Sequence, residues 1–265
     1  MNKLHVITLL TDFGYQDVYV GTMKGILAQI APHATPIDLT HQISPQDLWA
    51  AQFNLGNAYH YFPTNTIHLV VVDPGVGTSR RAIALHTNAG YFVAPDNGVL
   101  TPVLQQETLY QAVTLDRSDY WLTPKPSTTF HGQDIFAPIA AHLANGVTMT
   151  QLGSPIPVES LVQLPLPRPQ VTSEKIVGTV QYIDHFGNCI TNIAAEQLTG
   201  QAWAIQLDDQ TVSIGQTYGD RAPGAMVALI GSHGWLEIAL NRGNAQAQLQ
   251  WRVGKLVTIV KTATT

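Results

Sequence analysis

The 265-residue chain has little cysteine, little charge and no long apolar run, and each shortage excludes a class of protein. Its single cysteine, Cys189, cannot form an intrachain disulfide, so we expect a reducing, cytoplasmic compartment. Charged residues make up 12% of the chain, the net charge is −5 and no lysine- or arginine-rich run occurs, which argues against nucleic-acid and anionic-membrane partners. No apolar run approaches the ~18–20 residues of a membrane-spanning helix. The apolar residues 4–10 stop at Thr11-Asp12 without a cleavage site, which predicts a first strand rather than a signal peptide.

Motifs of several common enzyme classes are also missing. There is no His-Glu-x-x-His, no Cys-x-x-Cys and no calcium-binding loop, so we expect no metal. A Gly-x-Ser-x-Gly turn is absent, and Cys189 has no helix-start context, so the sequence gives no support to covalent acyl chemistry. Asp12-Phe13-Gly14 matches the magnesium-binding tripeptide of kinases, but no glycine-rich or His-Arg-Asp loop precedes it, and we treat the match as accidental.

The first part of the chain alternates strand and helix patterns. This order is typical of an α/β domain with a largely parallel sheet, which we place at residues 1–163. Ser44-Pro45 predicts a helix start, with serine as N-cap and proline in the first turn. The expected strands are residues 5–10, 36–39, 67–72, 82–85, 91–94 and 112–115, and the clearest helices are residues 18–30 and 135–143.

A proline-rich segment, residues 164–171, separates this domain from a different pattern. Alternating prolines make a stiff, extended linker. Beyond it the helical periodicity fades, and short β-type runs are separated by glycine turns. We therefore expect residues 172–265 to form a smaller, antiparallel, barrel-like β domain.

The most informative stretch of the chain is residues 70–81, where a run of valines ends in a carboxylate. Asp73 begins an Asp-Pro-Gly turn, and Arg80 and Arg81 follow within eight residues. Polar residues at the ends of parallel strands lie where open α/β sheets bind ligands. Asp-Pro-Gly is equally a good β-turn, and these residues alone favour that simpler interpretation.

Polar turns recur elsewhere in the first domain and could converge with this one in a single crevice. In a parallel sheet they would form an acidic pocket that also contains a cation and an imidazole. The four turns carry Asp12 and Asp17, Asp73 and Arg80, Asp96 and Asn97, and His131 and Asp134.

Six motifs occur together and in order, and between residues 4 and 262 they resemble one family. They are Thr11-Asp12-Phe13-Gly14, residues 72–80 (Val-Asp-Pro-Gly-Val-Gly-Thr-Ser-Arg), residues 94–98 (Ala-Pro-Asp-Asn-Gly), residues 130–138 (Phe-His-Gly-Gln-Asp-Ile-Phe-Ala-Pro), residues 184–188 (Asp-His-Phe-Gly-Asn) and residues 232–239 (Ser-His-Gly-Trp-Leu-Glu-Ile-Ala). The family is the adenosine-forming S-adenosyl-L-methionine (SAM) hydrolases, also called SAM hydroxide adenosyltransferases. They are relatives of the SAM-dependent fluorinating and chlorinating enzymes.

The resemblance implies that water cleaves SAM at the ribose C5′, giving adenosine and L-methionine without a cofactor. The family's water-polarising residues match Asp73, Arg80 and His131. Asp73 would orient the water and help to accept its proton, and Arg80 would favour the ionised carboxylate. His131 would complete the hydrogen-bond set and could relay the proton. Arg81 is the less suitable arginine because the family spacing places the functional one seven positions after the aspartate.

Substrate contacts carry over in the same way. Asp12 resembles the carboxylate that accepts both ribose hydroxyls. The other residues that the resemblance assigns to substrate binding are Asp17 and Asp184 near the methionine portion, Phe186 and Asn188 near adenine, Ser232 at the methionine carboxylate, and Asp96, Asn97 and Glu237. The resemblance also implies a homotrimer, with each ligand between the first domain of one subunit and the second domain of the next.

Three alternatives remain open. Halogenases carry a tyrosine where Asp73 stands, and a carboxylate disfavours a halide but suits water, so hydrolysis is favoured. A non-catalytic SAM or adenosine sensor would bind without turnover and would have no need of Asp73, Arg80 and His131 together. A metal-dependent nucleoside or phosphate hydrolase would lose activity with a chelator.

Overall fold

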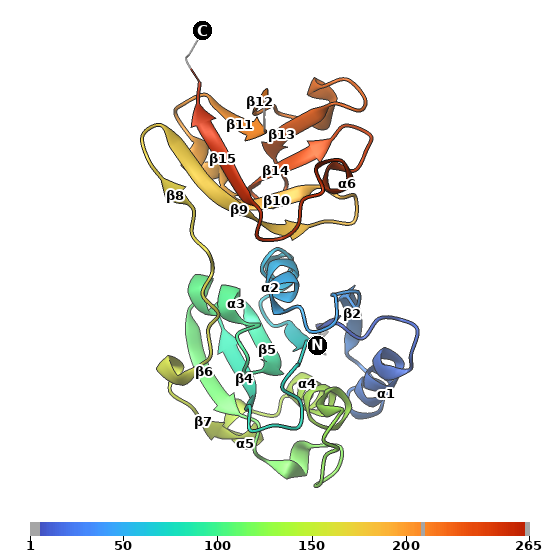
Figure 1. The fold of residues 1–265 in the computed structure, drawn as a ribbon. Helices are drawn as coiled ribbons and strands as arrows, with labels where there is room; N and C mark the ends of the chain where they lie inside the picture. The colour runs from blue at the N-terminus through green and yellow to red at the C-terminus, as the bar shows by residue number, and fades with distance from the viewer. Residues whose placement is uncertain (1–5, 208–209, 263–265) are drawn as a thin grey trace. The chain divides into compact units, whose positions relative to one another are not determined.

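The computed structural model describes residues 6–207 and 210–262 (Figure 1). The chain divides by its internal contacts into two units, the first ending at Leu164 and the second beginning at Pro165. The predicted strand at residues 5–10 and the outer domain limits, residues 1 and 265, reach beyond the described ranges. In the part of the chain that the structure describes, no helix is long and apolar enough to span a bilayer.

The first unit is built on a seven-stranded sheet of order β2-β1-β3-β5-β4-β6-β7. Its first four strands in this order are parallel, whereas β4, β6 and β7 join antiparallel. The α/β class is confirmed and the sheet is mixed, because a tight turn at residues 88–89 returns β4 directly into β5. The strands are β1 (Val6–Thr11), β2 (Thr35–Thr40), β3 (Ile67–Val71), β4 (Ala82–Thr87), β5 (Gly90–Pro95), β6 (Leu109–Thr114) and β7 (Ser154–Pro155).

Helices cover both faces of this sheet (Figure 1). On one face, α1 (Tyr19–Ile30) and α4 (Ala137–Ala144) bury Met23, Leu27 and Ile139 against inward-facing strand residues. On the other, α2 (Leu48–Gly56) and α3 (Thr101–Gln106) bury aliphatic side chains against the opposite set. Because β3 is covered on both sides, all five of its residues are buried, His68 among them, as its largely apolar pattern predicts. The short α5 (Met149–Leu152) precedes β7.

Two helix starts differ from the prediction. The helix expected at Ser44-Pro45 begins only at Leu48, where the Asp47 carboxylate accepts a hydrogen bond from the Ala50 amide at 2.9 Å. Gln46 takes a positive φ of 68°, which interrupts any helix begun at Pro45. Similarly, the helix expected at residues 135–143 is preceded by a π-helical turn, Gly132–Phe136, before α4 begins.

The second unit is an antiparallel sheet of order β12-β11-β15-β9-β10-β14-β13, with β8 beside β9. An isolated bridge between Ile214 and Ala228 links its outer strands, so the sheet is barrel-shaped and nearly closed, which confirms the predicted class. Cys189 lies fully buried in its core. The elements are β8 (Gln170–Val171), β9 (Lys175–Ile183), β10 (Cys189–Ala194), β11 (Trp203–Leu207), β12 (Gln210–Ser213), β13 (Met226–Ile230), β14 (Trp235–Leu240), α6 (Ala245–Leu249) and β15 (Leu256–Lys261).

Candidate active site

The order of strands in the first unit marks one point at which a ligand site is expected. From β1 the chain passes through α1 to β2 on one side, and it then returns through α2 to β3 on the other side of β1. The two helices consequently cover opposite faces of the sheet. Ligands of open α/β sheets bind beyond the carboxyl ends of strands at such a reversal. Asp12 follows β1 and Asp73 follows β3, so both carboxylates flank this point.

A cavity of about 290 Å³ opens there. Three aromatic side chains from separate segments form part of its wall, with the Tyr19 and Phe130 ring centroids 5.0 Å apart and those of Phe13 and Phe130 5.6 Å apart. The lining thus combines an aromatic wall with two carboxylates and an imidazole. The lining residues are Asp12, Phe13, Tyr19, Pro45, Gln46, Val71, Asp73, Val76, Thr129, Phe130, His131 and Gly132.

Arg80 joins the catalytic candidates into one hydrogen-bonded group. Its Nε lies 2.9 and 3.0 Å from the two carboxylate oxygens of Asp73, and its Nη2 also donates to Oδ2. The same Nη2 lies 2.9 Å from Nδ1 of His131. The side chains of Arg80 and Asp73 are only 10% and 5% exposed, and the guanidinium stands 5.2 Å from the Phe136 ring centroid. The predicted trio is therefore in mutual contact, with the arginine between the acid and the imidazole.

A close approach of two loops brings this trio together. Gly77 has φ of 74°, and a Cβ on it would lie 2.2 Å from the main-chain oxygen of Thr128. Only glycine fits both the conformation and the gap. The loop that carries Asp73 and Arg80 is thereby seated on the loop that leads to His131. Asp134, 3% exposed, holds the second loop by accepting a hydrogen bond from the Ser127 amide at 2.7 Å.

The contact with Arg80 also fixes the form of His131. A guanidinium only donates, so Nδ1 must accept, and this hydrogen-bond pattern assigns the proton of the neutral ring to Nε2. Burial lowers the pKa of His131 below its usual range, and the Arg80 guanidinium adds to the decrease. The imidazole is therefore neutral at pH 7, with its proton on Nε2.

Asp12 occupies another part of the same cavity. Its Oδ2 accepts a hydrogen bond of 2.7 Å from the main-chain amide of Gln46. Burial raises its pKa, and the Asp73 charge contributes in the same direction, although the Gln46 hydrogen bond opposes the rise. Asp12 is thus a carboxylate on the cavity wall, held by a backbone donor.

Three other predicted residues of the first unit lie outside the cavity lining. Asp17 is exposed, next to the start of α1. Asp96, 6% exposed, accepts hydrogen bonds from Arg81 at 2.9 Å and from the Val162 amide at 2.9 Å. Asn97 donates to the Val72 carbonyl at 2.9 Å. The Asp96 and Asn97 side chains therefore tie together loops, and Arg81, which the spacing disfavoured, is paired with Asp96 rather than Asp73.

The predicted residues of the second unit form two groups. In the turn after β9, Asp184 Oδ1 accepts hydrogen bonds from the amides of Phe186 and Asn188 at 2.9 and 2.8 Å. This turn leaves the Phe186 side chain 71% exposed. In the other group, Glu237 is 3% exposed and accepts hydrogen bonds from Tyr218 at 2.7 Å and from His233 at 3.2 Å, with Ser232 exposed beside them.

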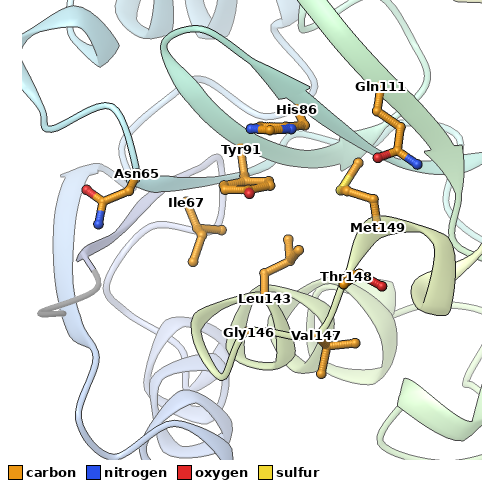
Figure 2. Close-up of a pocket in the computed structure, with 10 residues that line it drawn as sticks. All are labelled: Asn65, Ile67, His86, Tyr91, Gln111, Leu143, Gly146, Val147, Thr148 and Met149. Atoms are coloured by element: carbon orange, nitrogen blue, oxygen red, sulfur yellow. The ribbon is translucent and has the colours of Figure 1, made fainter. Parts of the chain in front are cut away.

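A second cavity in the first unit, of about 360 Å³, lacks the chemistry of the first (Figure 2). The His86 and Tyr91 rings stack at 4.3 Å on its wall, and Leu143 and Met149 face them. No lining residue carries a formal charge, and burial lowers the pKa of His86, so its imidazole is neutral at pH 7. This cavity has no carboxylate to activate a nucleophile, so of the two cavities the one at Asp73 is the candidate active site.

Sequence patterns predicted only part of the cavity lining. The aromatic wall of Phe13, Tyr19 and Phe130 was not predicted, although each residue lies in or beside a motif. The Gln46 contact uses only its backbone, which no side-chain pattern reveals. Among residues 6–207 and 210–262, no three His, Cys, Asp or Glu side chains come together as metal ligands.

Comparisons with known proteins cover both units. Residues 7–153 match the SAM hydroxide adenosyltransferase N-terminal domain, and residues 178–258 match the C-terminal domain of the same family. The chain is 38% identical to the (R)-S-adenosyl-L-methionine hydrolase of Thermus thermophilus, over 96% of this chain and 99% of that one. It is also 38% identical to the (R)-S-adenosyl-L-methionine hydrolase of Salinispora tropica, over 90% and 91% of the two chains.

A solved structure and a more distant enzyme complete the comparison. The crystal structure of an uncharacterized conserved protein from Thermotoga maritima superimposes with a TM-score of 0.89 at 37% identity, covering 96% of this chain and 99% of that one. A fluorinase of an Actinoplanes species is 25% identical over 97% of each chain. The chain is thus more similar in sequence to the hydrolases than to this fluorinase.

Proposed function

The chain belongs to the SAM hydroxide adenosyltransferase family, and on that premise we propose that it hydrolyses S-adenosyl-L-methionine to adenosine and L-methionine, with Asp73, Arg80 and His131 as its catalytic residues. The observation that carries the residue assignment is the single guanidinium that contacts both the buried carboxylate and the imidazole. All three side chains meet beside a cavity that two carboxylates line. The reaction needs no cofactor, because the sulfonium is itself a good leaving group.

The chemistry is one in-line displacement. A water oxygen forms a bond to the ribose C5′ while the C5′–S bond breaks. The electron pair of the broken C5′–S bond stays on sulfur and gives the methionine thioether. The water loses one proton, so SAM and water become adenosine, methionine and a proton. The protein therefore has two tasks, to align the water and to remove its proton.

We divide these tasks between two residues, and the hydrogen bonds of the trio support this division. Asp73 accepts a hydrogen bond from the water and takes its proton as the C–O bond forms. His131 donates its Nε2–H to the same oxygen, because Nδ1 is occupied by Arg80. Arg80 balances the charge of Asp73 and holds both groups in one orientation. The carboxylate also selects water over a halide, because placing two anions side by side in a buried site is unfavourable.

Substrate binding is assigned on the same premise. Asp12, on the cavity wall, accepts the two ribose hydroxyls, and the aromatic wall packs against the adenosine portion. For Asp17, Asp96 and Asn97, a role in substrate binding remains a prediction from the sequence. The second unit supplies Phe186 and Asn188 to adenine, Asp184 and Ser232 to the methionine portion, and Glu237 to substrate binding. We also place the protein in the cytoplasm, because its single cysteine suits a reducing compartment.

Incubation of the purified protein with SAM tests the proposal directly. Chromatography should show adenosine and methionine accumulating in equal amounts, at a rate that a chelator does not change. Added chloride or fluoride should give no halogenated nucleoside. SAM binding without adenosine above the spontaneous background would instead identify a sensor, and a 5′-halogenated product would identify a halogenase.

We further propose a homotrimer in which the second unit of one chain completes the site on the first unit of its neighbour. Phe186→Asp should abolish adenine binding without affecting folding, because that side chain is exposed. Mixed trimers of Asp73→Asn and Phe186→Asp chains should recover about a quarter of the wild-type activity, since one site in four then pairs two intact units. Mixtures of separately assembled trimers, which contain no hybrid site, provide the control. Activity no higher in mixed trimers than in this control would contradict a shared site.

A further inference from the structure

A chain of polar side chains, buried at its inner end, leads to the loop that carries Asp12. His41, fully buried at the end of β2, places Nδ1 2.8 Å from Oγ1 of Thr11, the last residue of β1. Its Nε2 lies 3.1 Å from Asp38 Oδ1, and the other oxygen of Asp38 accepts a hydrogen bond from Lys24 at 2.7 Å. The group thus runs from a partly exposed lysine to the residue before Asp12.

The direction of the hydrogen bond between Thr11 and His41 can be assigned. Thr11 Oγ1 accepts a hydrogen bond from the Phe13 amide at 3.2 Å, so its own proton is available for Nδ1 of His41. The imidazole then carries its proton on Nε2, which faces the Asp38 carboxylate. Burial lowers the pKa of His41, in agreement with a neutral ring in this orientation.

His41 holds the loop at two places. Its side chain contacts Thr11, and its main-chain carbonyl accepts a hydrogen bond of 2.7 Å from the Gly14 amide. Residues 12 and 13 therefore lie between two points fixed by one residue. The Gly14 φ of 68° makes the sharp turn that this geometry requires.

We propose that His41, supported by Asp38 and Lys24, is a positioning residue that sets the Asp12 carboxylate for the substrate ribose. This inference rests on the proposed function, because it gives Asp12 the ribose hydroxyls as its ligand. His41 acts through Thr11 and the loop backbone. Loosening the loop weakens binding in the ground state and the transition state alike, so KM rises and kcat changes little.

The chain contains a matched control three residues earlier on the same strand. Thr8 Oγ1 lies 2.8 Å from Nδ1 of His68, and both residues are as buried as the Thr11 and His41 pair. Thr8, however, lies within β1, away from the Asp12 loop. Thr11→Val and Thr8→Val each remove the hydroxyl of a buried threonine–histidine pair, but only Thr11→Val affects the loop, where it also removes the acceptor of the Phe13 amide. Thr11→Ser keeps the hydroxyl.

The experiment measures kcat and KM for SAM, the dissociation constant of adenosine by calorimetry, and thermal unfolding for the wild type and these three variants. Thr11→Val should raise KM and the adenosine dissociation constant about tenfold, with kcat within about twofold of wild type, because the Thr11 hydroxyl no longer bonds His41 and the Phe13 amide. Thr8→Val should lower the unfolding temperature as much as Thr11→Val does, but leave KM and the adenosine dissociation constant unchanged. In Thr11→Ser both constants should return to the wild-type values.

The possible failures are distinguishable. If Thr11→Val and Thr8→Val change the two constants equally, His41 is an ordinary buried histidine and the inference is wrong. If the wild type releases no adenosine from SAM, the proposed function fails, while the adenosine dissociation constants still decide the role of Thr11. A wild type that binds no adenosine at all overturns both.

Discussion

Asp73→Asn is expected to lower kcat for SAM hydrolysis by about 10³-fold, the range that loss of a general base produces. The asparagine side chain has the size of the aspartate, so the cavity keeps its shape. Its amide can still accept a hydrogen bond through oxygen, but it cannot take the water proton. KM should therefore change little, and calorimetry should still detect SAM binding.

A second aspartate provides the control for this substitution. Asp116 is exposed, and its carboxylate accepts a hydrogen bond from the Ser154 amide at 3.1 Å, away from the cavity. Asp116→Asn should retain full activity. An Asp73→Asn enzyme within tenfold of the wild-type kcat would show that another group takes the proton, and the assignment of Asp73 would be wrong.

Arg80→Gln is expected to reduce both stability and activity, because it removes the counter-charge of a buried carboxylate. The side chains of Arg80 and Asp73 are almost entirely buried, and breaking such a pair from one side costs about 3 kcal/mol of unfolding free energy. His131 also loses the donor on its Nδ1, so the ring is free to rotate or to exchange its proton between nitrogens. We expect kcat to fall about 10²-fold in consequence.

The pH profile of this variant carries further information. Arg80 contributes to the low pKa of His131, so its removal moves that pKa upwards. The acid limb of the activity profile, below which the imidazole is protonated, should therefore move to higher pH in Arg80→Gln. Burial, the larger cause of the low pKa of His131, is unchanged in this variant, so this pKa should stay below its usual range.

A double-mutant cycle separates stability from catalysis. Asp73→Asn combined with Arg80→Gln removes both charges, and unfolding free energies measured in urea should show recovery of most of the stability lost in Arg80→Gln. Activity should stay as low as in Asp73→Asn. Equal stability of Arg80→Gln and the wild type would contradict a buried, energetically coupled pair.

Local patterns in the sequence were sufficient for much of the fold, and the family resemblance predicted the core of the site. The unbroken apolar run before Asp73 predicted the buried strand, and the motifs predicted the three side chains that the structure brings into contact. The position of a motif residue at a strand end can be predicted, because the direction of the strand decides at which edge of the sheet the residue lies.

Features that depend on contacts between distant segments were not predictable. Ser44-Pro45 has good local chemistry for a helix start, yet Gln46 adopts a positive φ and donates its amide to Asp12, and Asp47 takes the cap. The role of His41 could not be predicted from the sequence for a related reason. Its partner Thr11 is thirty residues away, so no local spacing distinguishes it from any other core histidine.

The single thiol of the chain is a natural probe of local opening in the second unit. Cys189 is fully buried in β10, and burial, with the nearby charges of Asp184 and Glu237, raises its pKa to about 11. Both the barrier of surrounding atoms and the scarcity of thiolate protect it from alkylating reagents. The rate at which Cys189 is modified therefore reports how often the nearly closed barrel opens at β10, without an engineered label. The first unit has no cysteine and contributes nothing to this signal.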